Sequence, residues 1–285
     1  MPISCSLLAF AMKQFLTTCF FVLLVWPVEP CLAANENIVQ VHLTPEYTTF
    51  TKGQVARLGI QFEIKKGWHI YWLNPGESGL APRLTWQPNS ALEFSDAHWP
   101  HPEMFVTEQI QNFGYEGSAT VIQKFKIQKN FQGNQVDLQG KVEWLACQEV
   151  CIPGKQDLSQ TLKVGNKATI DSKAKDALDQ ASLQVPQDIA YWYIKVIDRD
   201  DHLLLKILPQ KKLVEQDLEI TFFPLTPGLS AMKIKGKRHA ANLFKVKKLD
   251  SFSKDEKTLK GVAVANYPFD EENKYTTLNI DQPIQ

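Results

Sequence analysis

Cysteine is scarce in this chain, and the cysteines fall into two groups. Of the five in 285 residues, Cys5, Cys19 and Cys31 lie in the first 34 residues, whereas Cys147 and Cys151 lie four positions apart much later. A single late pair excludes a disulfide-rich scaffold, which needs several bridges. The fold must therefore depend on a buried apolar core, and a hydrophobic content of 44% is sufficient to build one.

The chain has no excess charge of either sign. Lys and Arg together number 31, as do Asp and Glu, so the formal net charge is zero. Proteins that bind nucleic acid or an anionic membrane surface through charge usually carry a basic excess. The composition therefore gives no reason to expect either kind of partner.

Long apolar runs are missing, apart from one near the N-terminus. Residues 15–26 are predominantly apolar, follow a lysine and precede small residues at 32–34. This pattern is typical of a secretory signal peptide, here cleaved just before Asn35. The run is short for a membrane span of about 20 residues, although a membrane anchor, or a lipid anchor on Cys31, would use the same segment. We expect residues 1–34 to be a cleaved signal peptide, leaving a periplasmic mature chain with no membrane span.

Helical periodicity is weak over residues 35–168, where apolar and polar residues alternate instead. Leu58, Ile60 and Phe62 alternate with Gly59 and polar residues, which is the period of a half-buried strand. Further short runs of this kind are separated by turn signals containing Gly, Pro and Asn. About seven short strands of this kind predict an all-β fold, an antiparallel β-sandwich.

One later stretch favours a helix. Residues 169–187 contain a largely polar segment of high helix propensity, and Pro186 ends it. We interpret this segment as a linker helix. Alternation then resumes, so residues 188–285 are predicted to form a second small β domain with a structural or docking role.

The cysteine pair follows an alternating stretch in which Trp144 and Ala146 share one face. Residues four apart in a straight strand are separated by about 13 Å, whereas a disulfide needs Cα atoms within about 7 Å. Cys147 and Cys151 can therefore pair only if the chain bends between them. Such a bond in an exported protein is usually structural. A very short closed loop adds little stability, however, so an easily reduced bond stays open as the alternative.

Three ordered motifs resemble those of one family. They are GWHIYWLNPGESG at residues 67–79, FGYEG at 113–117 and WLACQEVCIP at 144–153. Together they resemble the N-terminal periplasmic domain of the transmembrane thiol:disulfide reductases, DsbD and its ScsB-type relatives. The resemblance covers most of residues 36–165. A weaker one relates the second domain to the β domain that follows in the ScsB-type branch.

The resemblance implies an immunoglobulin-like sandwich with a redox-active cysteine pair, Cys147 and Cys151, and with no bound cofactor or metal. It also implies a cap loop between Met104 and Tyr115, with Phe105 or Phe113 as the shielding ring. The residues expected to flank or cap the pair, or to bind partners, are Trp68, His69, Tyr71, Phe105, Phe113, Tyr115 and Trp144.

The implied function is a periplasmic module for thiol–disulfide exchange. It would relay reducing equivalents between a transmembrane thiol:disulfide reductase and oxidised periplasmic proteins, including thioredoxin-like ones. The resemblance also suggests links to cytochrome c biogenesis and copper tolerance. Because the membrane and thioredoxin-like parts are not in this sequence, the chain needs a partner to complete the relay. Its two cysteines also lie closer together than in the best-known members.

Two other functions stay open. One is a binding or assembly module whose disulfide is purely structural. The other is a periplasmic copper-handling protein that uses both reduced cysteines and a histidine, since thiols suit Cu(I). His98 and His101 flank a Trp-Pro pair, and we interpret that segment as a rim loop rather than a metal site.

The two sulfurs are expected to differ in exposure. Cys147 ends a packed strand, so Cys151 is predicted to be the more exposed of the two. No Lys, Arg or His lies between them to lower a thiol pKa. We therefore expect thiols without special activation, whose rate of exchange depends on partner docking. An aromatic wall of Trp68 and Tyr71 would support that docking.

Overall fold

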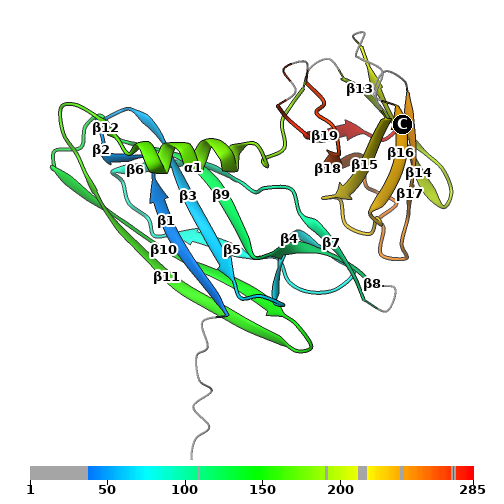
Figure 1. Cartoon of the computed structure of the whole chain (residues 1–285), viewed down its shortest axis with the longest axis horizontal. Coiled ribbons are helices and arrows are strands. Elements are labelled where there is room, and N and C mark those ends of the chain that lie inside the picture. The colour runs from blue at the N-terminus through cyan, green and yellow to red at the C-terminus, as the bar shows by residue number, and fades with distance from the viewer. Residues whose placement is uncertain are drawn as a thin grey trace, which may run out of the picture. The chain divides into compact units, whose positions relative to one another are not determined.

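Strands dominate the computed structural model, which describes residues 38–285 apart from 108–109, 190–191, 211–216, 238–240, 271 and 273. The signal-peptide prediction lies outside the described residues. Asn37–Gln285 form one compact unit. Figure 1 shows β-sheets throughout and a single α-helix among the described residues, which confirms the all-β prediction.

Two antiparallel sheets form the sandwich that contains the cysteines. The first has the order β1-β3-β9-β6, and the second has the order β11-β10-β4-β8-β7, with β5 pairing to β10. The strands of the first sheet are β1 (Val39–Pro45), β3 (Val55–Ile64), β6 (Leu92–His98) and β9 (Ser118–Ile127). Those of the second are β4 (His69–Gly76), β5 (Arg83–Trp86), β7 (Glu103–Thr107), β8 (Ile110–Glu116), β10 (Gln135–Cys147) and β11 (Cys151–Lys163). A small sheet pairs β2 (Tyr47–Thr49) with β12 (Thr169–Ile170).

The core of the sandwich comes from the alternation seen in the sequence. Leu58, Ile60 and Phe62 of β3 are fully buried, and Phe62 meets Trp144 of β10 edge-on, with 6.3 Å between ring centroids. Burying each such side chain stabilises the fold by roughly 1.5–3 kcal/mol before entropy is subtracted. This core fixes the two sheets face to face and so positions the strands that carry the cysteines.

Residues 75–118 are rich in loop-forming residues and show a strand pattern only near Leu84–Trp86, yet they contain the whole of β5, β6, β7 and β8. The alternation signal fails here because β6 is interrupted by a register shift between Phe94 and Ala97. In β8 the residues Phe113, Gly114 and Tyr115 are buried consecutively, so no two-residue period is visible.

The helix α1 (Ser172–Ser182) packs on the outer face of the first sheet (Figure 1). Asp171 caps its N-terminus by accepting a hydrogen bond from the Ala174 amide, 3.1 Å away. Leu178 is buried against Gly59, where an added Cβ would lie only 2.8 Å from a Leu178 methyl carbon. Arg57 of β3 pairs with Asp179 at 2.8 Å.

Within the described part of the chain, no helix is both long enough and apolar enough to cross a membrane.

The remaining strands form two further antiparallel sheets, of order β13-β14-β17 and β16-β15-β18-β19. Phe222, Phe244 and Leu205 are fully buried in their common core. The sequence predicts a strand at or near each of these except β16, in which only Met232 and Ile234 mark the apolar face between lysines. The strands are β13 (Trp192–Asp198), β14 (His202–Pro209), β15 (Asp217–Pro224), β16 (Met232–Lys237), β17 (Asn242–Lys247), β18 (Thr258–Ala265) and β19 (Thr277–Pro283).

Contacts of β15 reach the strands that carry the cysteine site. The ring of Phe223 meets Trp72 of β4 and Phe113 of β8 edge-on, with centroid distances of 6.5 and 5.6 Å. The side-chain amide of Asn74 donates to the carbonyl of Pro224 at 2.7 Å.

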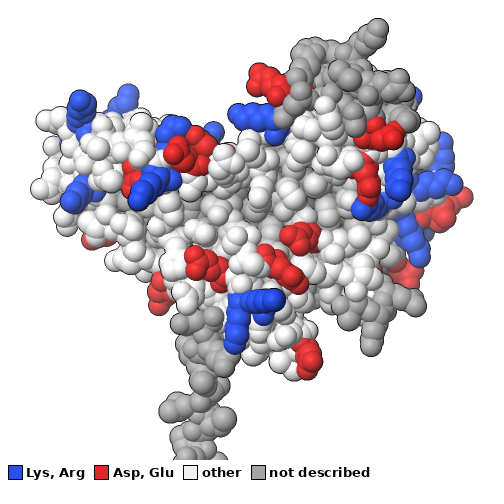
Figure 2. Space-filling model, viewed as in Figure 1, with Lys and Arg blue, Asp and Glu red and all other residues white. Residues whose placement is uncertain are grey.

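Charged groups of both signs are interspersed on the face seen in Figure 2, in keeping with the zero net charge.

Leu178→Ala should destabilise the protein by about 2–3 kcal/mol, because it removes buried methyl groups and leaves a cavity over Gly59. Urea unfolding followed by tryptophan fluorescence measures the effect. Lys173→Ala, at an exposed position of the same helix, is the matched control and should stay within about 0.5 kcal/mol of the wild type. Equal unfolding midpoints for the two variants would contradict the packing role of α1.

Candidate functional site

The two cysteines close a tight hairpin. β10 and β11 are in continuous antiparallel register from Gln135↔Lys163 to Cys147↔Cys151, and three residues connect them. The Gln148 amide donates to the Val150 carbonyl at 3.1 Å, which bends the loop. Cys147 and Cys151 form a disulfide with Cα atoms 4.1 Å apart. The bend that the spacing required is therefore a β-hairpin turn.

The two sulfurs differ in exposure because their strands differ in position. β10 lies inside the sheet between β11 and β4, whereas β11 is an edge strand. Cys147 is accordingly only 2% exposed, and Cys151 lies at the surface. This confirms the expectation that Cys151 is the more accessible of the two. Attack by a partner thiolate requires access to a sulfur, so Cys151 is the end of the bond open to such attack.

Tyr71 of β4 is in direct contact with the disulfide. Its hydroxyl donates to Cys147 Sγ at 3.2 Å and lies 4.0 Å from Cys151 Sγ. Burial raises the pKa of Tyr71, and a hydrogen bond with Ser78 opposes this. The phenol therefore stays protonated and can donate to a thiolate formed at Cys147. Tyr71 is 3% exposed, so it does not form the docking wall expected from the sequence.

Gly79 leaves the space that the Tyr71 ring occupies. Its φ of +96° lies in the left-handed region, and a Cβ there would lie 2.3 Å from ring carbons of Tyr71. Only glycine therefore permits both this backbone conformation and the close approach of the ring. We did not single out Gly79 from the sequence, although it ends the first of the three motifs.

His69 and Phe105 stack beside the pair. The β4–β10 register sets His69 directly opposite Cys147. The Phe105 ring, from β7, lies 4.9 Å from the imidazole centroid and nearly parallel to it. Burial lowers the pKa of His69, while the charge of Glu116 opposes this. Phe105 therefore covers the neighbourhood of the disulfide by resting on His69.

The expected cap loop is instead a β-hairpin of β7 and β8, and its tip at residues 108–109 lies outside the described residues. Phe113 is 1% exposed in the core and meets Phe223, so it is not the shielding ring. Register explains the difference. Phe105 pairs with Asn112 and Phe113 with Met104, so the two rings belong to opposite faces of the hairpin.

The other three expected site residues lie in the core or pack against it. Tyr115 donates its hydroxyl to the Pro100 carbonyl at 2.8 Å, and burial raises its pKa well above the usual range. Trp144 packs on Phe62, and Trp68 packs against the same core. Their placement in the motifs thus reflects the sandwich rather than contact with the sulfurs. Of the seven aromatic and histidine positions, His69, Tyr71 and Phe105 gather at the disulfide.

The rim of the site includes two exposed apolar residues that the sequence did not single out, beside the exposed Gln148 and Glu149. Val150, in the loop between the cysteines, is 63% exposed, and Ile152 follows Cys151 at 42%. Exposed apolar side chains around a reactive group are typical of a protein-binding surface.

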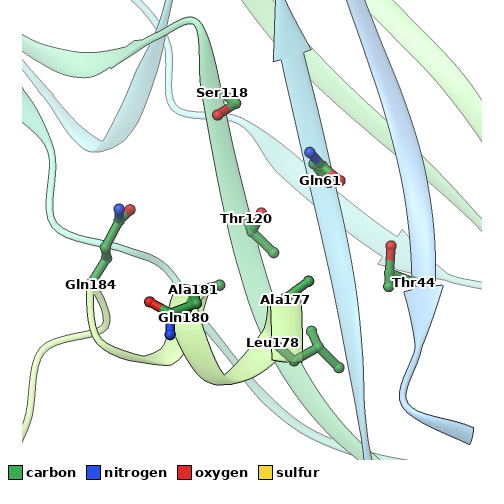
Figure 3. A pocket seen from close by; sticks show the side chains of 9 residues that line it. All are labelled: Thr44, Gln61, Ser118, Thr120, Ala177, Leu178, Gln180, Ala181 and Gln184. Carbon is green, nitrogen blue, oxygen red and sulfur yellow. The ribbon is translucent and has the colours of Figure 1, made fainter. Parts of the chain in front are cut away.

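Among the residues that the structure describes, no three His, Cys, Asp or Glu side chains could together hold a metal ion. A surface pocket of about 320 Å³ lies between α1 and the first sheet, lined by Gln61, Thr120 and other uncharged side chains (Figure 3). The polar groups of this pocket are hydroxyls and side-chain amides, and it contains no titratable group that could activate a hydroxyl, so it offers no comparable chemistry.

Comparison with known proteins agrees with this geometry. Residues 40–163 match the family described as "Thiol:disulfide interchange protein DsbD, N-terminal". No curated protein matches the chain.

Among solved structures, the N-terminal periplasmic domain of ScsB from Proteus mirabilis aligns with a TM-score of 0.57 and 19% identity, covering 88% of this chain and 95% of that one. The reduced N-terminal domain of DsbD from Neisseria meningitidis aligns over 50% of this chain and 96% of that one, with a TM-score of 0.30 and 16% identity. The family match falls on the sandwich that carries the disulfide, and the ScsB likeness extends the fold beyond it. Residues 40–163 are therefore a DsbD-type N-terminal domain with an immunoglobulin-like fold.

Proposed function

We propose that this chain is a periplasmic thiol–disulfide exchange module that relays reducing equivalents through Cys147 and Cys151. One observation carries the proposal: one cysteine of the disulfide lies at the surface, and the sulfur of the other, buried cysteine accepts a hydrogen bond from Tyr71. A purely structural bond needs no donor to its sulfur and no exposed end. The family match supports the same chemistry.

The geometry supports a definite order of steps. A partner thiolate attacks Cys151 Sγ, the S–S bond breaks, and its electron pair leaves on Cys147. The new bond joins Cys151 to the partner sulfur as a mixed disulfide. The Tyr71 hydroxyl, 3.2 Å from Cys147 Sγ, stabilises the leaving thiolate. In the reverse direction Cys147 attacks the mixed disulfide and releases the partner.

The proposed partners follow from the family and from the rim. A transmembrane thiol:disulfide reductase would supply electrons, and oxidised periplasmic proteins of the thioredoxin-like kind would receive them. The exposed Val150 and Ile152 give such partners an apolar surface beside Cys151. Export by a cleaved signal peptide over residues 1–34 belongs to this proposal, as do roles in cytochrome c biogenesis or copper tolerance.

Cys147→Ala should trap a covalent complex with a thioredoxin-like partner, because Cys151 can form the mixed disulfide but nothing resolves it. Cys151→Ala should trap far less, since Cys147 is buried. Non-reducing electrophoresis of periplasmic extracts, followed by mass spectrometry, measures both. If neither variant traps a partner while both fold, the disulfide is structural.

Phe105→Ala should speed reduction of the disulfide by a small thiol several-fold, because it uncovers the bond to attack. Stopped-flow tryptophan fluorescence of the full chain measures the rate. Val106→Ala is the matched control: Val106 is the next residue on β7, faces away and is 58% exposed. Equal rates for the wild type and both variants would remove the shielding role from Phe105.

A further inference from the structure

One nitrogen of His69 is buried without a hydrogen-bond partner. Nε2 of this imidazole is shielded from solvent, and none of the described residues pairs with it. Buried polar atoms are nearly always hydrogen-bonded, so an exception needs a cause. A partner that exists only in another state of the protein would be such a cause.

The sheet register indicates where that partner lies. His69 stands directly opposite Cys147. Residues directly opposite on antiparallel strands project to the same face, with Cβ atoms about 4.5–5.5 Å apart. Tyr71 projects to this face as well, because it lies two residues further along β4, and its hydroxyl already reaches Cys147 Sγ. The imidazole, stacked on the ring of Phe105, therefore projects from the same face of the sheet as the buried sulfur.

Disulfide and dithiol differ in protons as well as electrons. A disulfide sulfur carries no hydrogen, whereas a thiol can donate a hydrogen bond and a thiolate can accept one. Reduction would therefore make Cys147 a hydrogen-bond partner for Nε2, which has none in the oxidised protein. Cys147 is 2% exposed, so bulk water is a poor source or sink for its proton. Cys151 lies at the surface and can exchange its proton with solvent.

We propose that His69 Nε2 and Cys147 Sγ share one proton in the reduced protein, and that His69 accepts this proton when Cys147 attacks. This inference rests on the proposed function. Cys151 first attacks the partner disulfide and forms a mixed disulfide, and one partner sulfur leaves as a thiolate. Cys147 then attacks Cys151 Sγ and passes its proton to Nε2, while the second partner sulfur leaves. The two partner thiolates become thiols by taking the protons released from Cys151 and from His69.

The charged and titratable groups around His69 are consistent with this role. Burial lowers its pKa, so the imidazole is neutral and one ring nitrogen can accept a proton. Glu116 of β8 pairs with His69 in register, and its charge favours the imidazolium once formed. Glu103 of β7 has a pKa raised by burial and by Glu116. Tyr71, with its raised pKa, stays a hydrogen-bond donor.

The test compares His69→Phe with the wild type in the reduced full-length protein. Phenylalanine keeps a ring under Phe105 but has no nitrogen. Ultraviolet thiolate absorbance is followed against pH. The wild type should develop its first thiolate at a pH lower by roughly one unit than the variant, because an imidazolium beside a thiolate favours ionisation. His42→Phe is the matched control; His42 is exposed on β1 beside Glu63, and its removal should leave the curve unchanged.

Superimposable titration curves for the wild type and H69F would overturn the proposal. Nitrogen NMR of the wild-type imidazole gives a second measurement that needs no folded variant. The His69 Nε2 shift should change between the disulfide and dithiol forms, and an unchanged shift would also overturn the proposal. Neither measurement involves a partner protein. The role of His69 can therefore fail while the trapping experiment succeeds, and the reverse also holds.

Discussion

The short β10–β11 hairpin is the constraint on which the site depends. Its register makes Cys147 and Cys151 a directly opposite pair, with Cα atoms 4.1 Å apart. The position of the hairpin in the sheet then makes the two sulfurs unequal. β10 is flanked on both sides, whereas β11 forms the edge, so Cys147 is buried and Cys151 lies at the surface.

β4 serves the site and the core at the same time, because its side chains alternate between two faces. His69 and Tyr71 project toward the sulfurs. Ile70 and Trp72 project the other way and are fully buried, and Trp72 meets Phe223 of β15. The same packing that stabilises the sandwich therefore fixes the distance between the Tyr71 hydroxyl and Cys147. The contact with β15 gives the C-terminal sheets a physical connection to this strand.

The sequence predicted the sandwich and the cysteine hairpin because both depend on local patterns. Alternation in β3 and β10 is strict, and two cysteines four residues apart can pair only across a bend. The assignment of aromatic residues was less successful. Phe105 and Phe113 are indistinguishable in sequence, and only the β7–β8 pairing shows that they face opposite ways. Tyr115 and Trp144 belong to the motifs as well, but Tyr115 is buried in the core and the half-buried Trp144 packs against it.

Gly79 lies far from the cysteines in sequence, yet it determines where the Tyr71 ring can sit beside them. With φ at +96° and the Tyr71 ring against its Cα, this residue has no room for even a methyl group. A side chain there would push the phenol away from Cys147 without touching either sulfur. A substitution at this one loop position would therefore change how easily the disulfide accepts electrons. It would leave the surface that recognises partners unaltered.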